Sequence, residues 1–395
     1  MLVLLPIGNP SATAQDQDLA LVGGTIYASP TAASLHDATV LIHGTTIAAV
    51  GRSSEIAIPK SARVIACAGK VITAGFWNSH VHFETGWGNA QEMSPAKFKA
   101  QMQEMLTRWG FTTVWDLGSN PQNTLTIRKR VENGEVLGPR ILMAGDIFPK
   151  NGHPVYLPPE MQLIEAATPG EAGRESRQYL QLGLDGIKLF TGAFMGNKPV
   201  VNMDTAIVKA AVGVAHDQHK PVFAHPQNRA GVDSAVAGGV DVLAHTIPSD
   251  ISFTEVEIHA MKEHHVALSP TLTLWTTVVS DAESQKRMVE YGIAELKQYS
   301  SVGGTILFGT DVGFQSKYDT TQEYEFMGRA MSWREILASL TTNPSEFFKS
   351  PSEGRVAKGL RADLVVLDGD PAEDVKNFAK VSAAIRDGQV IYSAQ

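Results

Sequence analysis

Residues 74–83 read AGFWNSHVHF, a short apolar run that ends in two histidines, His80 and His82. Seven further runs of this kind follow along the chain, and segments with helical periodicity lie between them. Eight strand-and-helix units within about 270 residues predict an α/β fold, a (β/α)8 barrel of the TIM type. The other runs are FTTVWDLG (111–118), RILMAG (140–145), GIKLF (186–190), KPVFAHP (220–226), VDVLAHT (240–246), VALSPTL (266–272) and TILFGTD (305–311).

A doubly wound parallel sheet is the alternative arrangement for alternating strands and helices. Sheets of that kind that bind dinucleotides open a helix with Gly-x-Gly-x-x-Gly, and none of the predicted helices begins with this pattern. The sequence therefore favours the barrel and gives no support for nucleotide binding.

Both ends of the chain differ from the middle. Short alternating apolar runs separated by turns fill residues 18–73 and return within residues 351–395. Because neither set alone would cover its apolar face, we predict one small β-sandwich domain built from both chain ends. The barrel then occupies residues 74–350, and residues 1–17 form a separate tail.

The tail combines features of a signal peptide with features of a disordered segment. Residues 1–15 read MLVLLPIGNPSATAQ, an apolar run, a Pro/Gly break and the small-x-small triplet Ala12-Thr13-Ala14. We expect a periplasmic or secreted protein, with a cytoplasmic one as the alternative. No other stretch approaches the roughly 20 apolar residues that span a bilayer.

Composition narrows the classes of partner and of chemistry. The 395 residues carry a net charge of -8, and both signs are mixed along the chain. This distribution offers no basic patch, so neither nucleic acid nor an anionic membrane is an expected partner. The single cysteine, Cys67, excludes an intramolecular disulfide and a cysteine-based zinc cluster.

Ionisable side chains fall where the predicted barrel strands end. Barrel strands all point their carboxyl ends at one face, so these residues should converge although they are far apart in sequence. One histidine at a strand end is more often structural than a ligand, but six groups at matching ends favour a metal site. His80 and His82 stand two apart on one strand and can bind one metal together. The full set is His80, His82, Lys188, His225, His245 and Asp311.

Lys188 is unusual among these residues because it lies inside the apolar strand GIKLF, where burying an ammonium group costs free energy. One interpretation is an ion pair with Asp311 or another nearby carboxylate. The other is that the neutral amine has combined with carbon dioxide, forming a carbamate whose two oxygens bridge two metals.

The loop after the third run contains Asn-Gly-His-Pro and should lie on the same face as the strand ends. We therefore predict that His153 and Tyr156 contact the substrate, with His153 also taking part in catalysis. The wall of the site could include Glu84, Trp87, Phe194 and Trp275, although packing is the usual role of aromatic residues. Solvated or capping roles on the outer helices are expected for His216, His219, His259, His264 and His265.

Taken in order, these segments resemble the amidohydrolase superfamily, in its imidazolonepropionase-like and prolidase-like branch, from about Leu19 to the C-terminus. One departure concerns Asn78, which replaces the Asp of the family's usual Pro-Gly-Leu-Ile-Asp lead into the histidine pair. The matching segments are Gly75–His82, Ile187-Lys188, Ala224-His225, Ala244-His245, Gly309-Thr310-Asp311 and Lys358–Asp368.

The resemblance implies two divalent metal ions, with zinc the expected metal. It implies that His80, His82 and Asp311 bind the more buried ion. His225 and His245 would bind the more exposed one, with carbamylated Lys188 as the bridge. Imidazolonepropionases use a single metal, and Lys188 favours the binuclear, peptidase-like members.

The implied activity is hydrolysis of an amide bond in a dipeptide, an N-acyl amino acid or a related small amide. A water activated by the metals would attack the amide, with Asp311 moving its proton. The alternatives are a cyclic amide or amidine, a lactone, and a catalytically silent metal-binding scaffold. The expected partner is a small-molecule amide or peptide, and we expect a homo-oligomer.

Overall fold

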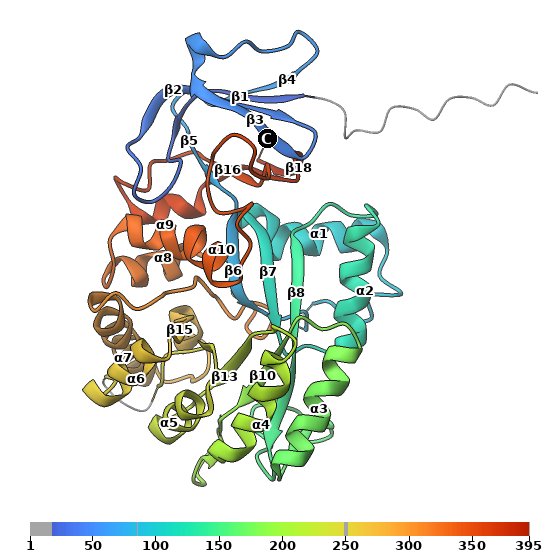
Figure 1. Ribbon diagram of the computed structural model, residues 1–395, viewed down its shortest axis with the longest axis vertical. Helices are drawn as coiled ribbons and strands as arrows, with labels where there is room; N and C mark the ends of the chain where they lie inside the picture. Colours follow the sequence, from blue (N-terminus) through green and yellow to red (C-terminus); the bar gives the residue numbers. More distant parts are fainter. Residues whose placement is uncertain (1–17, 85, 249–251, 395) are drawn as a thin grey trace, which may run out of the picture.

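The computed structural model describes residues 18–84, 86–248 and 252–394 (Figure 1). The tail predicted for residues 1–17 lies outside the described residues. Strands from both ends of the chain form a sheet at one end of the molecule, and the barrel with its surrounding helices forms the rest (Figure 1). No helix among the described residues is long and apolar enough to cross a lipid bilayer.

The barrel sheet contains seven consecutive parallel strands in the order β15-β14-β13-β10-β8-β7-β6. Each of the first seven predicted runs supplies one of them. Their burial is nearly complete, which explains why they read as continuous apolar runs. The strands are β6 (Phe76–Val81), β7 (Phe111–Leu117), β8 (Arg140–Pro149), β10 (Gly186–Phe190), β13 (Val222–His225), β14 (Val242–Leu243) and β15 (Ala267–Leu268).

The eighth run closes the barrel although it is not a regular strand. Ile306 bridges Leu268 of β15, and Val312 bridges Val81 of β6. Asp311 has a φ of 58°, a left-handed conformation that interrupts strand geometry at this point. The predicted TIM-like barrel is therefore confirmed, with an irregular closing segment in place of an eighth strand.

Helices cover the outside of the barrel (Figure 1). Three of them begin with a capping box, in which a Ser or Thr and the Glu three residues later bond each other's backbone N–H groups. The helices are α1 (Pro95–Met105), α2 (Pro121–Glu132), α3 (Pro169–Gln181), α4 (Thr205–His216), α5 (Arg229–Gly238), α6 (Glu255–Glu263), α7 (Ala282–Ser301), α8 (Thr321–Gly328), α9 (Trp333–Leu340) and α10 (Thr342–Phe347). Shorter elements are β9 (Glu165–Ala166), β11 (Gly192–Ala193), β12 (Val201–Asn202), η2 (Ser53–Glu55), η3 (Thr107–Trp109), η4 (Leu272–Thr276) and η5 (Val375–Ala379).

The second sheet joins the two chain ends in the order β18-β17-β16-β5-β1-β2-β3, with β4 also paired to β1. The junction is the antiparallel pair β5·β16, in which Thr73 faces Val365. Both ends thus share one hydrogen-bonded sheet, while the finer expectation of a β-sandwich stays a prediction. The strands are β1 (Leu19–Ile26), β2 (Leu35–His43), β3 (Thr46–Arg52), β4 (Arg63–Ala66), β5 (Val71–Ala74), β16 (Leu364–Leu367), β17 (Val381–Arg386) and β18 (Gln389–Ser393).

Candidate metal centre

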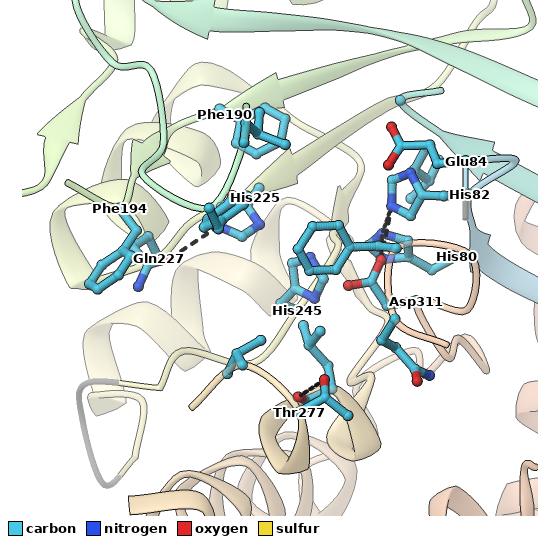
Figure 2. Close-up of a pocket in the computed structure, with 18 of the residues that line it drawn as sticks. His80, His82, Glu84, Phe190, Phe194, His225, Gln227, His245, Thr277 and Asp311 are labelled. Atoms are coloured by element: carbon cyan, nitrogen blue, oxygen red, sulfur yellow. Dashed lines mark hydrogen bonds and ion pairs between the residues drawn. The ribbon is translucent and has the colours of Figure 1, made fainter. Parts of the chain in front are cut away.

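Three side chains meet where the barrel closes. Nε2 of His80 lies 3.1 Å from Oδ1 of Asp311, and Nε2 of His82 lies 2.9 Å from the same oxygen. The two Nε2 atoms are 3.3 Å apart. His80 and Asp311 are buried, and His82 has 12% of its side chain exposed. Residues separated by more than two hundred positions are thereby brought together (Figure 2).

The backbone of the closing segment places Asp311 at this point. The N–H of Asp311 donates to the carbonyl oxygen of His80 at 2.9 Å, and the N–H of His82 donates to Val312 at 2.8 Å. Gly313 follows with a φ of 98°, and a Cβ there would lie 1.7 Å from the carbonyl oxygen of His82. Only glycine therefore fits at residue 313 without displacing the chain that carries the histidine pair.

Asn78, the departure noted in the sequence, links the same two segments. Its side-chain N–H donates to Oγ1 of Thr310 at 2.7 Å, and its carbonyl oxygen accepts from the N–H of His80 at 3.2 Å. An amide has both a donor and an acceptor, so Asn78 holds the residue before Asp311 and the first histidine at once.

His245 and His225 extend the cluster across the barrel (Figure 2). The ring centroids of His245 and His80 are 4.6 Å apart, and those of His225 and His245 are 4.8 Å apart. One ligand atom each from His80, His245 and Asp311 lies within 4.8 Å of the others, and all three residues are buried. Both predicted histidines at the ends of the fifth and sixth runs therefore reach the site.

Lys188 also faces this space from β10, and only 1% of the residue is exposed. Burial lowers the pKa of its amine to about 8, although Asp311, Asp146 and Asp116 act in the opposite direction. A lysine of this kind has an appreciable neutral fraction near neutral pH, which both ligation and carbamylation require.

The donors fit a divalent cation. Three buried polar atoms of the site have no hydrogen-bond partner within the described chain: Nδ1 of His80, Nδ1 of His82 and Oδ1 of Asp311. The Oδ1 atom does have an imidazole nitrogen of each histidine close by. Burial lowers the pKa of His80 to about 3 and that of His225 to about 4, so both rings are neutral. Neutral imidazoles together with a buried carboxylate form the donor set that zinc and related metals bind.

A cavity of about 550 Å3 opens onto this cluster and is lined by all six predicted metal ligands. Tyr156, Glu84, Phe194 and Trp275 also line it. Trp87 is instead buried against Phe83 and Phe98 in the core.

His153 is not among the residues that line the cavity. Its ring nitrogens lie 3.2 Å from the carbonyl oxygens of Pro154 and Met161, within its own loop. The substrate contact and catalytic role expected for His153 stay predictions.

Two further residues contact His245 and His225, and the sequence analysis did not identify them. Oγ1 of Thr271 lies 2.7 Å from Nδ1 of His245, and the amide oxygen of Gln227 lies 3.2 Å from Nε2 of His225. Both residues have a positive φ, 47° for Thr271 and 58° for Gln227. Nothing in the local sequence marks a threonine or a glutamine for that conformation, so no pattern could have identified them.

Fold and site together define a TIM-like barrel with a metal-binding site at the carboxyl ends of its strands. The chain belongs to the amidohydrolase family, whose sequence features match residues 71–391. It is accordingly a hydrolase, and the resemblance inferred from the sequence is confirmed.

Relatives of known sequence or structure agree with this assignment. Ochratoxinase from Aspergillus niger is 24% identical over 403 residues, which cover 88% of this chain and 81% of the relative. A candidate prolidase from Bifidobacterium longum has a similar structure, with a TM-score of 0.82, 24% identity and 96% of each chain covered. A Xaa-Pro dipeptidase with bound methionine has a TM-score of 0.80 and 20% identity, covering 96% of this chain and 100% of that one. At these identities the structural likeness demonstrates the shared fold.

Proposed function

We propose that the protein uses divalent metal ions to hydrolyse an amide bond in a dipeptide, an N-acyl amino acid or a related small amide. The observation that carries the proposal is the convergence of His80 and His82 on the buried carboxylate of Asp311, with His245 beside them, at the face where barrel enzymes have their active sites. Relatives described as a prolidase and a dipeptidase support an amide as the bond that is cleaved.

Each residue of the cluster has a proposed task. His80, His82 and Asp311 would hold one cation, His225 and His245 would hold a second, and Lys188 would hold both as a carbamate. When bound, the cations would lower the pKa of a water molecule and polarise the scissile carbonyl.

Asp311 is the proposed proton carrier. It would accept a proton from the attacking water and deliver it to the leaving amine, because its carboxylate is buried beside the histidine ligands and lines the cavity. Tyr156 lines the same cavity and is a proposed substrate contact. Its ring centroid lies 5.5 Å from that of Phe314, with the two rings edge to face.

The test combines metal analysis with a substrate screen. Purified protein should contain about two equivalents of zinc or a similar metal, and it should release amine from dipeptides or N-acyl amino acids. Asp311→Asn should keep the fold but lower turnover by several orders of magnitude. Asp319→Asn is a matched control, since Asp319 is exposed in the same loop and its side chain accepts from the N–H of Thr321.

Activity of Asp311→Asn within tenfold of the wild type would remove Asp311 from the proton-carrying role. Absence of bound metal together with absence of amine release would overturn the proposed function itself.

A further inference from the structure

The histidines of the candidate metal centre are packed against aromatic side chains. Phe190 stacks on His225 with centroids 4.9 Å apart and an interplanar angle of 29° (Figure 2). Phe314 stands edge-on to His82 at 6.3 Å, and Trp275 stands edge-on to His245 at 6.1 Å. These three aromatic residues come from different strand ends and loops. Apolar surface therefore begins directly beside the ligands on several sides of the cavity.

Apolar side chains continue from there to the mouth of the cavity. Phe148 stacks on Phe190 with centroids 4.0 Å apart, which extends the aromatic wall along β8. The same cavity is also lined by Leu274, Val279 and Met288, which come from η4, the segment after it and α7.

The mouth exposes large apolar groups to solvent. Tyr156 is 40% exposed, Met161 37%, Phe194 38% and Val278 42%, and all four line this cavity. Exposed apolar side chains gathered at one opening, rather than scattered singly, mark a surface that a ligand covers.

Charged groups are few in this cavity. Apart from the predicted metal ligands, its charged lining residues within the described chain are Glu84, Asp146 and Lys317. Glu84 and Asp146 act electrostatically on His82, so they belong to the surroundings of the metal centre. Lys317 lies exposed in the loop after the closing segment, where its amine contacts Gln322. Among the described lining residues, Lys317 is thus the cation that lies outside the metal centre, and no charged pair is available there to bind a polar side chain of a substrate.

We propose that the substrate is an amide with a bulky apolar group, preferably aromatic, on at least one side of the scissile bond. The inference rests on the proposed function and specifies its substrate class. In the reaction, water adds its oxygen to the acyl carbon, the C–N bond breaks, and the leaving amine takes up a proton. The products are one carboxylic acid and one amine, and no other reactant is needed. A cavity of about 550 Å3 is within the range that encloses a drug-sized ligand.

Two series of amides test the preference. The first keeps phenylalanine as the amine and varies the acyl group from acetyl through hexanoyl and benzoyl to 2-naphthoyl. The second keeps a 2-naphthoyl or acetyl group and varies the amine from glycine to phenylalanine. Each methylene buried in an apolar pocket is worth about tenfold or more in kcat/KM, so kcat/KM should rise by about a hundredfold or more along at least one series.

The outcomes separate this inference from the function on which it rests. If N-acetylglycine is hydrolysed as fast as the naphthoyl and benzoyl amides, the inferred substrate class is wrong but the protein is still an amide hydrolase. If metal-loaded protein releases amine neither from these series nor from dipeptides, the proposed function fails as well.

A substitution at the mouth tests the wall directly. Phe194→Ala should raise KM for N-2-naphthoylphenylalanine about tenfold, several times more than it raises KM for N-acetylglycine. Val256→Ala is the control, because Val256 is 77% exposed on α6 and lies outside the cavity. Equal zinc content and melting temperature will show that the variants are folded. Equal losses for both substrates, or no loss for either, would contradict the inference.

Discussion

The hydroxyl oxygen of Thr271 lies 2.7 Å from Nδ1 of His245, and both side chains are buried. The same hydroxyl donates its single proton to the carbonyl oxygen of Pro270 at 2.9 Å. It therefore accepts a hydrogen bond from Nδ1 of His245, which places the imidazole proton there and leaves the lone pair on Nε2. Thr271 thus fixes the tautomer of a candidate metal ligand.

Thr271→Val should weaken metal binding without opening a large cavity, because valine has the shape of threonine but no acceptor for Nδ1. Loss of such a partner typically lowers metal affinity by about 10- to 100-fold. Zinc affinity measured by competition with a chelator checks this expectation. Thr271→Ser keeps the hydroxyl and should bind zinc nearly as the wild type does; equal affinity in Thr271→Val would contradict the role.

Glu323 holds the chain immediately after Thr271. Its buried carboxylate accepts from the N–H groups of Leu272 at 2.8 Å and Thr273 at 2.7 Å. Burial nevertheless raises the pKa of Glu323 from 4.5 to about 7. The folded protein therefore binds a proton at Glu323 more tightly than the unfolded chain, so this group's contribution to stability is greatest below pH 4.5 and falls as the pH rises towards 7.

Glu323→Gln removes this titration. The free energy of unfolding of the wild type should fall relative to that of the variant between pH 5 and pH 8, by about 3 kcal/mol at most for a shift of this size. Urea unfolding at several pH values provides the measurement. Glu325→Gln, at an exposed position on the same helix, should leave the pH dependence unchanged. Parallel pH profiles for the wild type and Glu323→Gln would show that the buried carboxyl does not titrate as inferred.

Much of the candidate site could be predicted because strand ends in a barrel share one face. His80, His82, Lys188, His225 and Asp311 occur in or at the ends of apolar runs, and the fold alone brings them together. The eighth run was predicted as a strand but is irregular. Asp311 adopts a left-handed backbone conformation that the surrounding sequence does not predict.

The residues that position the histidines could not be predicted, again because of unusual backbone conformations. Thr271 and Gln227 meet the histidines through backbone conformations that are rare for their residue types. Glu323 lies 50 positions after Thr273 in the sequence, and only the folded chain shows that its carboxylate accepts from the N–H groups of Leu272 and Thr273. The position of a loop residue such as His153 depends on the backbone path of its loop, which the periodicity of the sequence does not predict.

Lys188→Ala should lose at least one of about two equivalents of zinc, because it removes the only proposed group that contacts both cations. Zinc content after dialysis against a metal-free buffer gives the stoichiometry. Lys209→Ala provides the control, since Lys209 is an exposed lysine on α4. Retention of both equivalents in Lys188→Ala would exclude the bridging role.

Arg140, at the start of β8, joins the barrel to the segment that leads into the second sheet. Its Nη1 lies 3.0 Å from Oε1 of Glu353 and 3.3 Å from Oδ2 of Asp363. Glu353 is 5% exposed and Asp363 3%, and burial raises the pKa of both carboxyls although Arg140 opposes the shift. Loss of the guanidinium would leave two buried carboxylates without this cation.

Arg140→Met should therefore lower the free energy of unfolding by up to about 3–5 kcal/mol at pH 8, the usual cost of removing one partner of a buried ion pair, with Arg361 at 3.8 Å from Glu353 as the remaining cation. The loss should be smaller at pH 5, because Glu353 and Asp363 can then take up protons and become neutral. Arg329→Met is the matched control: Arg329 pairs with Glu290 at 2.6 Å, but both side chains are more than 40% exposed, at 46% and 44%. An exposed pair contributes only about 0–1 kcal/mol, so equal losses in the two variants would mean that Arg140 does not stabilise this junction.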